Sequence, residues 1–153
     1  MIIMTIDPGD HIGTLVVALD SSGNTLLTLG RTIEGDDRNC KLWKYMYGIK
    51  PDKIIYERFA LRAGAAQKLV GNTFITCEVI GVVKLFSQLY DIGKDNLIEL
   101  LPSCKEYCGF SSSPKDPRYK DIHMYKDEKI TEHVRDTYRL YSYYKLFGNK
   151  INK

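Results

Sequence analysis

The chain has 153 residues, 44% of them apolar, and a formal net charge of +3. This length and apolar content suit a single domain with a buried core over residues 1–153. No apolar run is long enough to cross a membrane, and residues 1–6 lack the basic start of a signal peptide, so we expect a cytoplasmic protein with no membrane partner. The four cysteines are too sparse for a disulfide framework and suit a reducing compartment, and Cys104 and Cys108 have no second pair that would favour a zinc site.

The charge is unevenly spread along the chain. Residues 1–101 contain 11 Lys and Arg against 12 Asp and Glu, whereas residues 102–153 contain 11 against 7. A basic C-terminal third favours a polyanionic partner, although many solvated helices carry a similar excess.

The first predicted element is a strand that leads to a carboxylate. Residues 1–6 are apolar apart from Thr5, and Asp7 follows directly, before the turn residues Pro8 and Gly9. So short and apolar a run is typical of a central strand buried on both faces. A carboxylate at the end of such a strand is costly unless it is paired. Asp7 is therefore either a turn residue or a metal ligand, and the second interpretation requires other carboxylates at the same point.

Two further strands and a helix follow. Residues 12–19 and 25–33 have strand character and are separated by a good hairpin turn at residues 21–24, which predicts an antiparallel meander of three strands. Residues 38–48 carry apolar side chains at helical spacing and predict a short amphipathic helix.

The fourth predicted strand also ends at a carboxylate. Residues 52–57 contain the apolar run 54–56 and end at Glu57. A strand reached through a helix is usually parallel to its neighbour, so Asp7 and Glu57 emerge at the same edge if the two strands are adjacent. Two adjacent carboxylates repel each other unless a cation joins them, and a turn-forming Asp7 does not explain such a pair.

The segment after this strand, residues 58–68, has three basic residues, no acidic residue and an aromatic one. A basic loop beside an acidic site suits a phosphate backbone with a base to stack on, so we predict DNA contacts at Arg58, Phe59, Arg62 and Lys68. The alternative is an ordinary loop in which Phe59 packs inward.

Residues 65–90 form the longest helical pattern, and they leave little polar face. Such a helix is buried by the sheet, by a partner subunit or by both. Residues 97–101 predict a fifth strand, and a short helix then begins at Pro102, with Lys105 in its first turn.

Residues 109–127 are irregular by composition, and their basic residues include Lys115, Arg118 and Lys120. This segment either faces nucleic acid or is simply a long connection.

The last predicted helix covers about residues 130–147. His133 and Asp136 are three positions apart and share one face in its first turns. An isolated pair of this kind is most often solvated or locally bonded. Together with Asp7 and Glu57 it becomes a more specific arrangement, in which three carboxylates and one imidazole could meet a metal.

The order of these motifs resembles the RuvC family of Holliday junction resolvases, which belongs to the RNase H-like superfamily. The segments 6–9, 54–57 and 132–136 resemble the first, second and last motifs of that family, and segment 102–105 is similar to the strand end before its lysine. The resemblance covers nearly the whole chain, and the compactness of the chain is closest to phage-encoded members.

The resemblance implies an α/β protein with an RNase H-like fold, a five-stranded mixed sheet of three antiparallel N-terminal strands followed by parallel strands, flanked by helices. It implies a homodimer joined at the apolar helix 65–90, which presents two active sites to the two symmetric cut sites of a four-way junction. The implied activity is Mg²⁺-dependent cleavage of Holliday junctions and other branched DNA in recombination and repair. The implied catalytic and metal-binding residues are Asp7, Glu57, His133 and Asp136. The predicted DNA contacts beyond residue 68 are Lys105, Lys115, Arg118 and Lys120.

Physical chemistry supports this interpretation of the acidic residues. Phosphodiester hydrolysis needs a nucleophilic water, charge neutralisation at phosphorus and help for the leaving oxygen, and two Mg²⁺ ions about 4 Å apart supply all three. Carboxylate oxygens suit Mg²⁺, and Mn²⁺ accepts less ideal ligand sets and is expected to substitute for it. Asp7 is the predicted bridging ligand because it comes from the central strand, and His133 is predicted to bind the second ion or to orient a water there.

The chain departs from the family pattern at several points. The spacing from Asp7 to the next glycine is shorter by one, and Thr137 and Tyr138 follow Asp136 where small residues are usual. Phe59 stands two residues after the glutamate and not three. Two other classes stay open. One is a non-catalytic branched-DNA-binding module of the same fold. The other is an actin-like ATPase fragment, which the absence of a second lobe and of a glycine-rich adenosine loop makes the weaker alternative.

Overall fold

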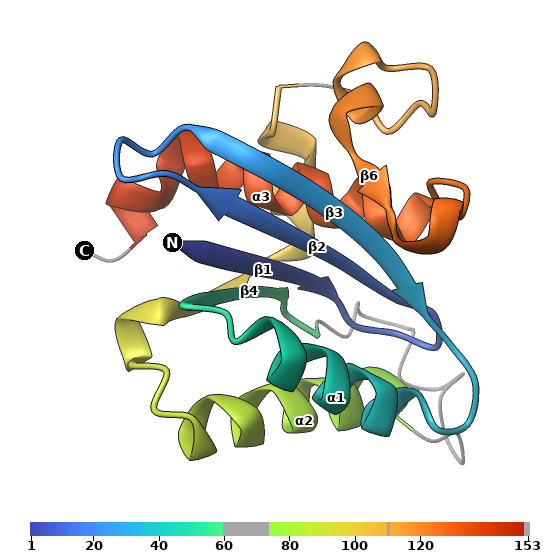
Figure 1. The fold of residues 1–153 in the computed structure, drawn as a ribbon, viewed down its shortest axis with the longest axis vertical. Coiled ribbons are helices and arrows are strands. Elements are labelled where there is room, and N and C mark those ends of the chain that lie inside the picture. The colour runs from blue at the N-terminus through green and yellow to red at the C-terminus, as the bar shows by residue number, and fades with distance from the viewer. Residues whose placement is uncertain (60–73, 110, 152–153) are drawn as a thin grey trace.

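The first strand lies inside a mixed sheet of six strands, in the order β5-β4-β1-β2-β3-β6 (Figure 1). The computed structural model describes residues 1–59, 74–109 and 111–151. The strands are β1 (Ile2–Asp7), β2 (Ile12–Leu19), β3 (Thr25–Ile33), β4 (Lys53–Glu57), β5 (Leu97–Leu100) and β6 (His123–Met124). The α-helices are α1 (Arg38–Ile49), α2 (Ile75–Leu89) and α3 (Glu132–Ile151), and short 3₁₀ helices are η2 (Lys94–Asn96), η3 (Pro102–Tyr107), η4 (Pro117–Asp121) and η5 (Tyr125–Asp127).

The pairing of the strands follows the prediction, with one correction. β1, β2 and β3 form the antiparallel meander, and β4 and β5 continue the sheet in parallel to β1. The predicted count of five strands is wrong, because β6 pairs in parallel with Leu29 and Gly30 of β3. β6 is only two residues long and lies in the segment predicted to be irregular, so it has no periodicity that a sequence pattern could reveal.

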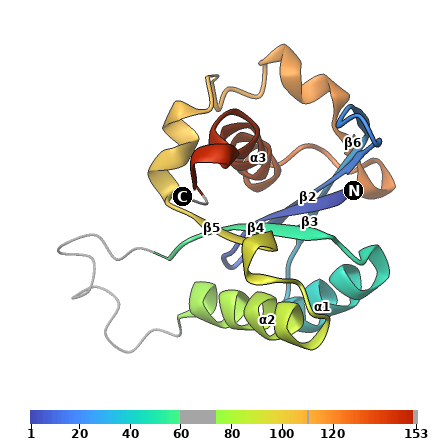
Figure 2. The same cartoon turned by 90° about the vertical axis from the view of Figure 1, so that its left-hand side faces the viewer.

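Helices cover both faces of the sheet, with α1 and α2 on one side and α3 on the other (Figure 2). The side chains of β1 alternate between the two cores: Met4 and Ile6 pack with residues of α1 and α2, while Ile3 packs in the cluster that includes residues of α3. This arrangement confirms that β1 is a central strand buried on both faces.

The helices differ slightly in extent from their predicted ranges. α2 begins at Ile75, and the predicted helical residues 65–73 lie outside the described residues. α3 begins two residues later than predicted and continues to Ile151. In the ranges that the structure covers, no helix is both long enough and apolar enough to cross a bilayer.

Candidate active site

The ends of two adjacent parallel strands bring the first two predicted carboxylates together. β1 pairs with β4 in a register that sets Ile6 opposite Tyr56, so Asp7 and Glu57 lie at the same edge of the sheet, as predicted. Both side chains are largely buried, with 14% and 16% of their surfaces exposed. Two carboxylates at this depth need a compensating cation.

The start of α3, the last helix of the sequence, brings His133 and Asp136 to the same point. The imidazole Nδ1 of His133 lies 3.2 Å from Oδ2 of Asp7. Gly13, which pairs with Asp7 across β1 and β2, makes this approach possible. A Cβ atom at residue 13 would overlap the backbone oxygen of His133, so α3 can approach β2 this closely only because residue 13 is a glycine.

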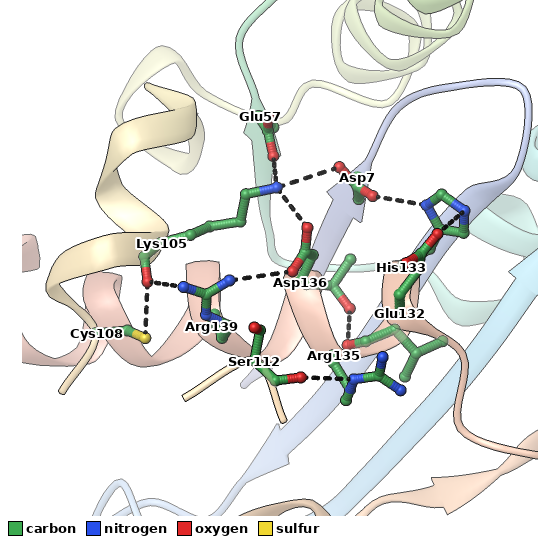
Figure 3. Close-up of polar contacts among 12 residues, drawn as sticks. Asp7, Glu57, Lys105, Cys108, Ser112, Glu132, His133, Arg135, Asp136 and Arg139 are labelled. Carbon is green, nitrogen blue, oxygen red and sulfur yellow. Dashed lines mark hydrogen bonds and ion pairs between the residues drawn. The ribbon is translucent and has the colours of Figure 1, made fainter. Parts of the chain in front are cut away.

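The cation between these carboxylates is the ammonium group of Lys105, which η3 carries into the site (Figure 3). Its Nζ lies 2.7 Å from Oε2 of Glu57 and 2.7 Å from Oδ2 of Asp136, and 3.9 Å from Oδ1 of Asp7. Only 15% of the Lys105 side chain is exposed. Sequence reasoning gave Lys105 a role in DNA contact and missed its position among the three carboxylates.

The charges of this cluster shift one another's pKa values. Burial raises the pKa of Glu57 to about 7, and the neighbouring Asp7 carboxylate adds to this rise. The Lys105 ammonium acts in the opposite direction and lowers the pKa of Glu57. Burial alone would lower the pKa of Lys105, but the three carboxylates around its ammonium outweigh this effect and raise it. The hydrogen bond to Asp7 raises the pKa of His133. The lysine therefore stays protonated, and Glu57 holds its proton more tightly than an exposed glutamate.

Arg139 links the two sides of the cluster and was not predicted. Its Nη1 donates to Oδ1 of Asp136 at 3.3 Å, and its Nη2 donates to the backbone oxygen of Lys105 at 2.6 Å. The thiol of Cys108 donates to the same backbone oxygen at 3.1 Å. The spacing of three residues between Asp136 and Arg139 on one helix is a signal that could have indicated the first of these contacts.

A second histidine lies against the first. The rings of His11 and His133 are stacked, with centroids 5.6 Å apart and planes 21° apart. Nδ1 of His11 lies 2.8 Å from Oε2 of Glu34. The His11 ring therefore limits the positions that the His133 ring can adopt beside Asp7.

The donor set of the cluster fits a divalent cation in charge and in chemistry. Within the described residues, no group of three His, Cys, Asp or Glu side chains forms a ready-made metal site. The carboxylates of Asp7, Glu57 and Asp136 instead surround a cation of the protein's own, Lys105. They are the hard oxygen donors that Mg²⁺ prefers.

The predicted DNA contacts are less closely grouped. Arg58 is exposed and lies 3.6 Å from Glu99, while Phe59 is partly buried against the core, edge to face with Phe74. Arg62 and Lys68 lie outside the described residues. The predicted contacts in the irregular segment, Lys115, Arg118 and Lys120, are all exposed. The Arg118 guanidinium is held by Asp116 and by the backbone oxygen of Gly109.

The fold has close counterparts among solved structures, although no family model and no curated protein matches the sequence. The chain is similar to Thermus thermophilus RuvC in complex with a Holliday junction substrate, with 12% identity, a TM-score of 0.67 and coverage of 97% of this chain and 96% of that one. It is similar to the yeast mitochondrial Holliday junction resolvase, with 14% identity, a TM-score of 0.56 and coverage of 98% and 80%. It is also similar to the Fowlpox virus resolvase solved with substrate Holliday junction DNA, with 14% identity, a TM-score of 0.54 and coverage of 96% and 99%. The chain therefore has the mixed α/β, RNase H-like fold of the RuvC-type resolvases, as predicted.

Proposed function

We propose that the protein is a metal-dependent endonuclease that cleaves Holliday junctions and other branched DNA by phosphodiester hydrolysis. The observation that carries this proposal is the convergence of Asp7, Glu57 and Asp136, from β1, β4 and α3, on one largely buried point beside His133. Three carboxylates that meet at one point repel one another, and a divalent cation bound there would offset this repulsion beyond what Lys105 and Arg139 supply. The likeness to resolvases solved with junction DNA supports the choice of substrate.

The same residues provide the parts of a hydrolytic mechanism. Asp7, Glu57 and Asp136 would hold two Mg²⁺ ions, with Asp7 as the bridging ligand, and Mn²⁺ would substitute. When bound, these ions supply the activated water and neutralise the charge that develops at phosphorus. His133, which is fixed between Asp7 and the His11 ring, would bind the second ion or orient a water there. Lys105 holds the carboxylates together and adds a positive charge where the phosphate would lie.

Contacts with the DNA arms would come from basic residues around the cluster. We propose that Arg58 and Phe59, directly after Glu57, contact the strand near the cut, and that further exposed residues bind backbone phosphates. These further residues are Lys115, Arg118 and Lys120. The enzyme would act in recombination and repair. Its four cysteines are all free, which suits the reducing cytoplasm of its own cell, or of a host cell if a phage carries the gene.

A cleavage assay on labelled four-way, forked and linear DNA tests this function. In Mg²⁺ we expect cuts in the four-way junction, weaker or no cuts in linear duplex, and no cuts in EDTA. Junction binding without cleavage in either Mg²⁺ or Mn²⁺ would favour the non-catalytic module. Saturable ATP binding without junction binding would favour the ATPase fragment and contradict the proposal.

We also propose that the protein is a homodimer that contacts its partner through α2. The outer face of this helix exposes Leu85 and Leu89, with 50% and 64% of their surfaces accessible, and Phe74, just before the helix, is also exposed. At Gly81, between them, a Cβ atom would meet nothing within 4 Å, so a partner could approach closely. Sedimentation at micromolar concentration should give a dimer, and Leu85→Glu together with Leu89→Glu should give a folded monomer. A monomeric parent protein, both with and without junction DNA, would contradict this arrangement.

A further inference from the structure

A second charged site lies on the opposite face of the sheet from the carboxylate cluster. Arg31 of β3 pairs with Thr14 of β2, which in turn pairs with Ile6 of β1, so these three side chains share the face that α1 and α2 cover. Asp7, the next residue of β1, points to the other face and contacts His133 of α3. A ligand at Arg31 would therefore not touch the carboxylate cluster.

The Arg31 guanidinium lies between two aromatic rings. Its central carbon is 5.0 Å from the ring centroid of Tyr45 on α1 and 4.4 Å from that of Tyr125 in η5. In the part of the chain that the structure describes, this guanidinium has no carboxylate within ion-pair distance and donates no side-chain hydrogen bond. Stacking fixes the plane of the guanidinium and leaves its N–H groups available to an acceptor.

A cavity of about 270 Å³ lies beside this arginine, along one face of α1. Its lining is basic and contains no acidic residue: Arg31, Lys41, Lys44, Tyr45, Gly48 and Ile49. Lys41 already contacts Asp37 at 2.8 Å, whereas Lys44 has no ion pair in the described residues. The cavity thus offers positive charge and hydrogen-bond donors without a matching acceptor.

The hydroxyl of Tyr45 is a further donor without an acceptor. Its oxygen is buried, and it has no hydrogen-bond partner among the described residues. A buried hydroxyl without a partner costs free energy, and this cost is recovered if a bound group supplies the acceptor.

We propose that this cavity, formed by Arg31, Lys44 and Tyr45, is a binding site for a phosphate group, either free or as part of a nucleic acid strand. A tetrahedral phosphate has several acceptor oxygens and can meet a guanidinium, an ammonium and a hydroxyl that approach from different directions. The cavity is somewhat smaller than a drug-sized pocket, which suits a phosphate with part of an attached sugar. This inference does not depend on the proposed nuclease activity, because the site shares no residue with the carboxylate cluster.

Titration of the ¹⁵N-labelled protein with inorganic phosphate tests the site, in EDTA and at constant ionic strength. We expect saturable shifts of the amides of residues 31, 44, 45 and 125. Arg31→Met should weaken binding about 10-fold or more, and Tyr45→Phe, which removes only the hydroxyl, about 3-fold or more. Lys94→Met removes an exposed charge at the other end of the sheet and should change the affinity by less than about 2-fold.

A parallel titration with a short thymidine oligonucleotide identifies the source of the phosphate. Tighter binding of the oligonucleotide, lost in Arg31→Met, would assign the site to a strand, and tighter binding of inorganic phosphate would assign it to the free anion. The absence of saturable shifts at these residues, or equal losses in Arg31→Met and Lys94→Met, would overturn the proposal. If Arg31→Met does not fold, Tyr45→Phe decides, because unchanged phosphate affinity in that variant also contradicts the site.

Discussion

Replacing Asp7 by Asn should lower the rate of junction cleavage by about three orders of magnitude or more, which corresponds to about 4 kcal/mol in the activation barrier. The amide has the same size as the carboxylate but no charge, so it removes the predicted bridging ligand without removing volume. Junction affinity should hold or rise, because an anion that faces a phosphate is lost. Single-turnover cleavage in Mg²⁺ and a separate binding titration in EDTA measure the two effects.

Further substitutions separate a catalytic role of these side chains from a structural one. Glu57→Gln and Asp136→Asn should behave like Asp7→Asn, since each removes one anionic ligand, while His133→Ala should be milder and partly rescued by Mn²⁺. Glu99→Gln is the matched control, because Glu99 is a carboxylate on the adjacent strand β5 that pairs with Arg58 and lies outside the cluster. It should cut at the parent rate. An Asp7→Asn protein that melts like the parent and still cuts at the parent rate would refute the mechanism.

The meeting of Asp7 and Glu57 at one edge of the sheet could be predicted from the sequence, because it depends on local patterns. Asp7 and Glu57 each follow a buried apolar run, and the helix between their strands favours a parallel pairing by topology alone. His133 and Asp136 share a helix face by their spacing. Their meeting with Asp7 depends on where α3 packs, and only the resemblance to a known family indicated that position.

The remaining contacts could not be predicted because they depend on segments that have no regular pattern. Lys105 enters the cluster from a short 3₁₀ helix, and a lysine in such a segment has no periodicity that identifies its partners. The stacking of His11 on His133 joins residues 122 positions apart. The close approach at Gly13 is likewise a tertiary effect, since the glycine is needed there only because the backbone of α3 lies against it.

Replacing Lys105 by Met should destabilise the metal-free protein by about 3–5 kcal/mol at neutral or higher pH. Methionine keeps most of the length and the apolar surface of lysine but leaves three largely buried carboxylates without their shared cation, and an uncompensated buried charge costs this much.

The loss of stability in Lys105→Met should be smaller at acidic pH. The Lys105 ammonium lowers the pKa of Glu57, which burial raises to about 7. Without the ammonium, that pKa rises further. A group whose pKa is raised in the folded state stabilises the fold below its unfolded pKa and loses this contribution as the pH rises through the folded value, so the variant should be least stable at high pH.

Divalent cations should then restore stability in Lys105→Met more than they stabilise the parent, because in the variant no ammonium competes for the carboxylates. At a concentration about a hundredfold above its dissociation constant, Mg²⁺ should return about 2.7 kcal/mol. Denaturant unfolding in EDTA and in Mg²⁺ at several pH values measures both effects, with Lys120→Met as the control for loss of an exposed lysine. If Mg²⁺ stabilises the parent and Lys105→Met equally, the ammonium and the metal do not share the carboxylates. The cluster would then be a structural ion pair and not a metal site.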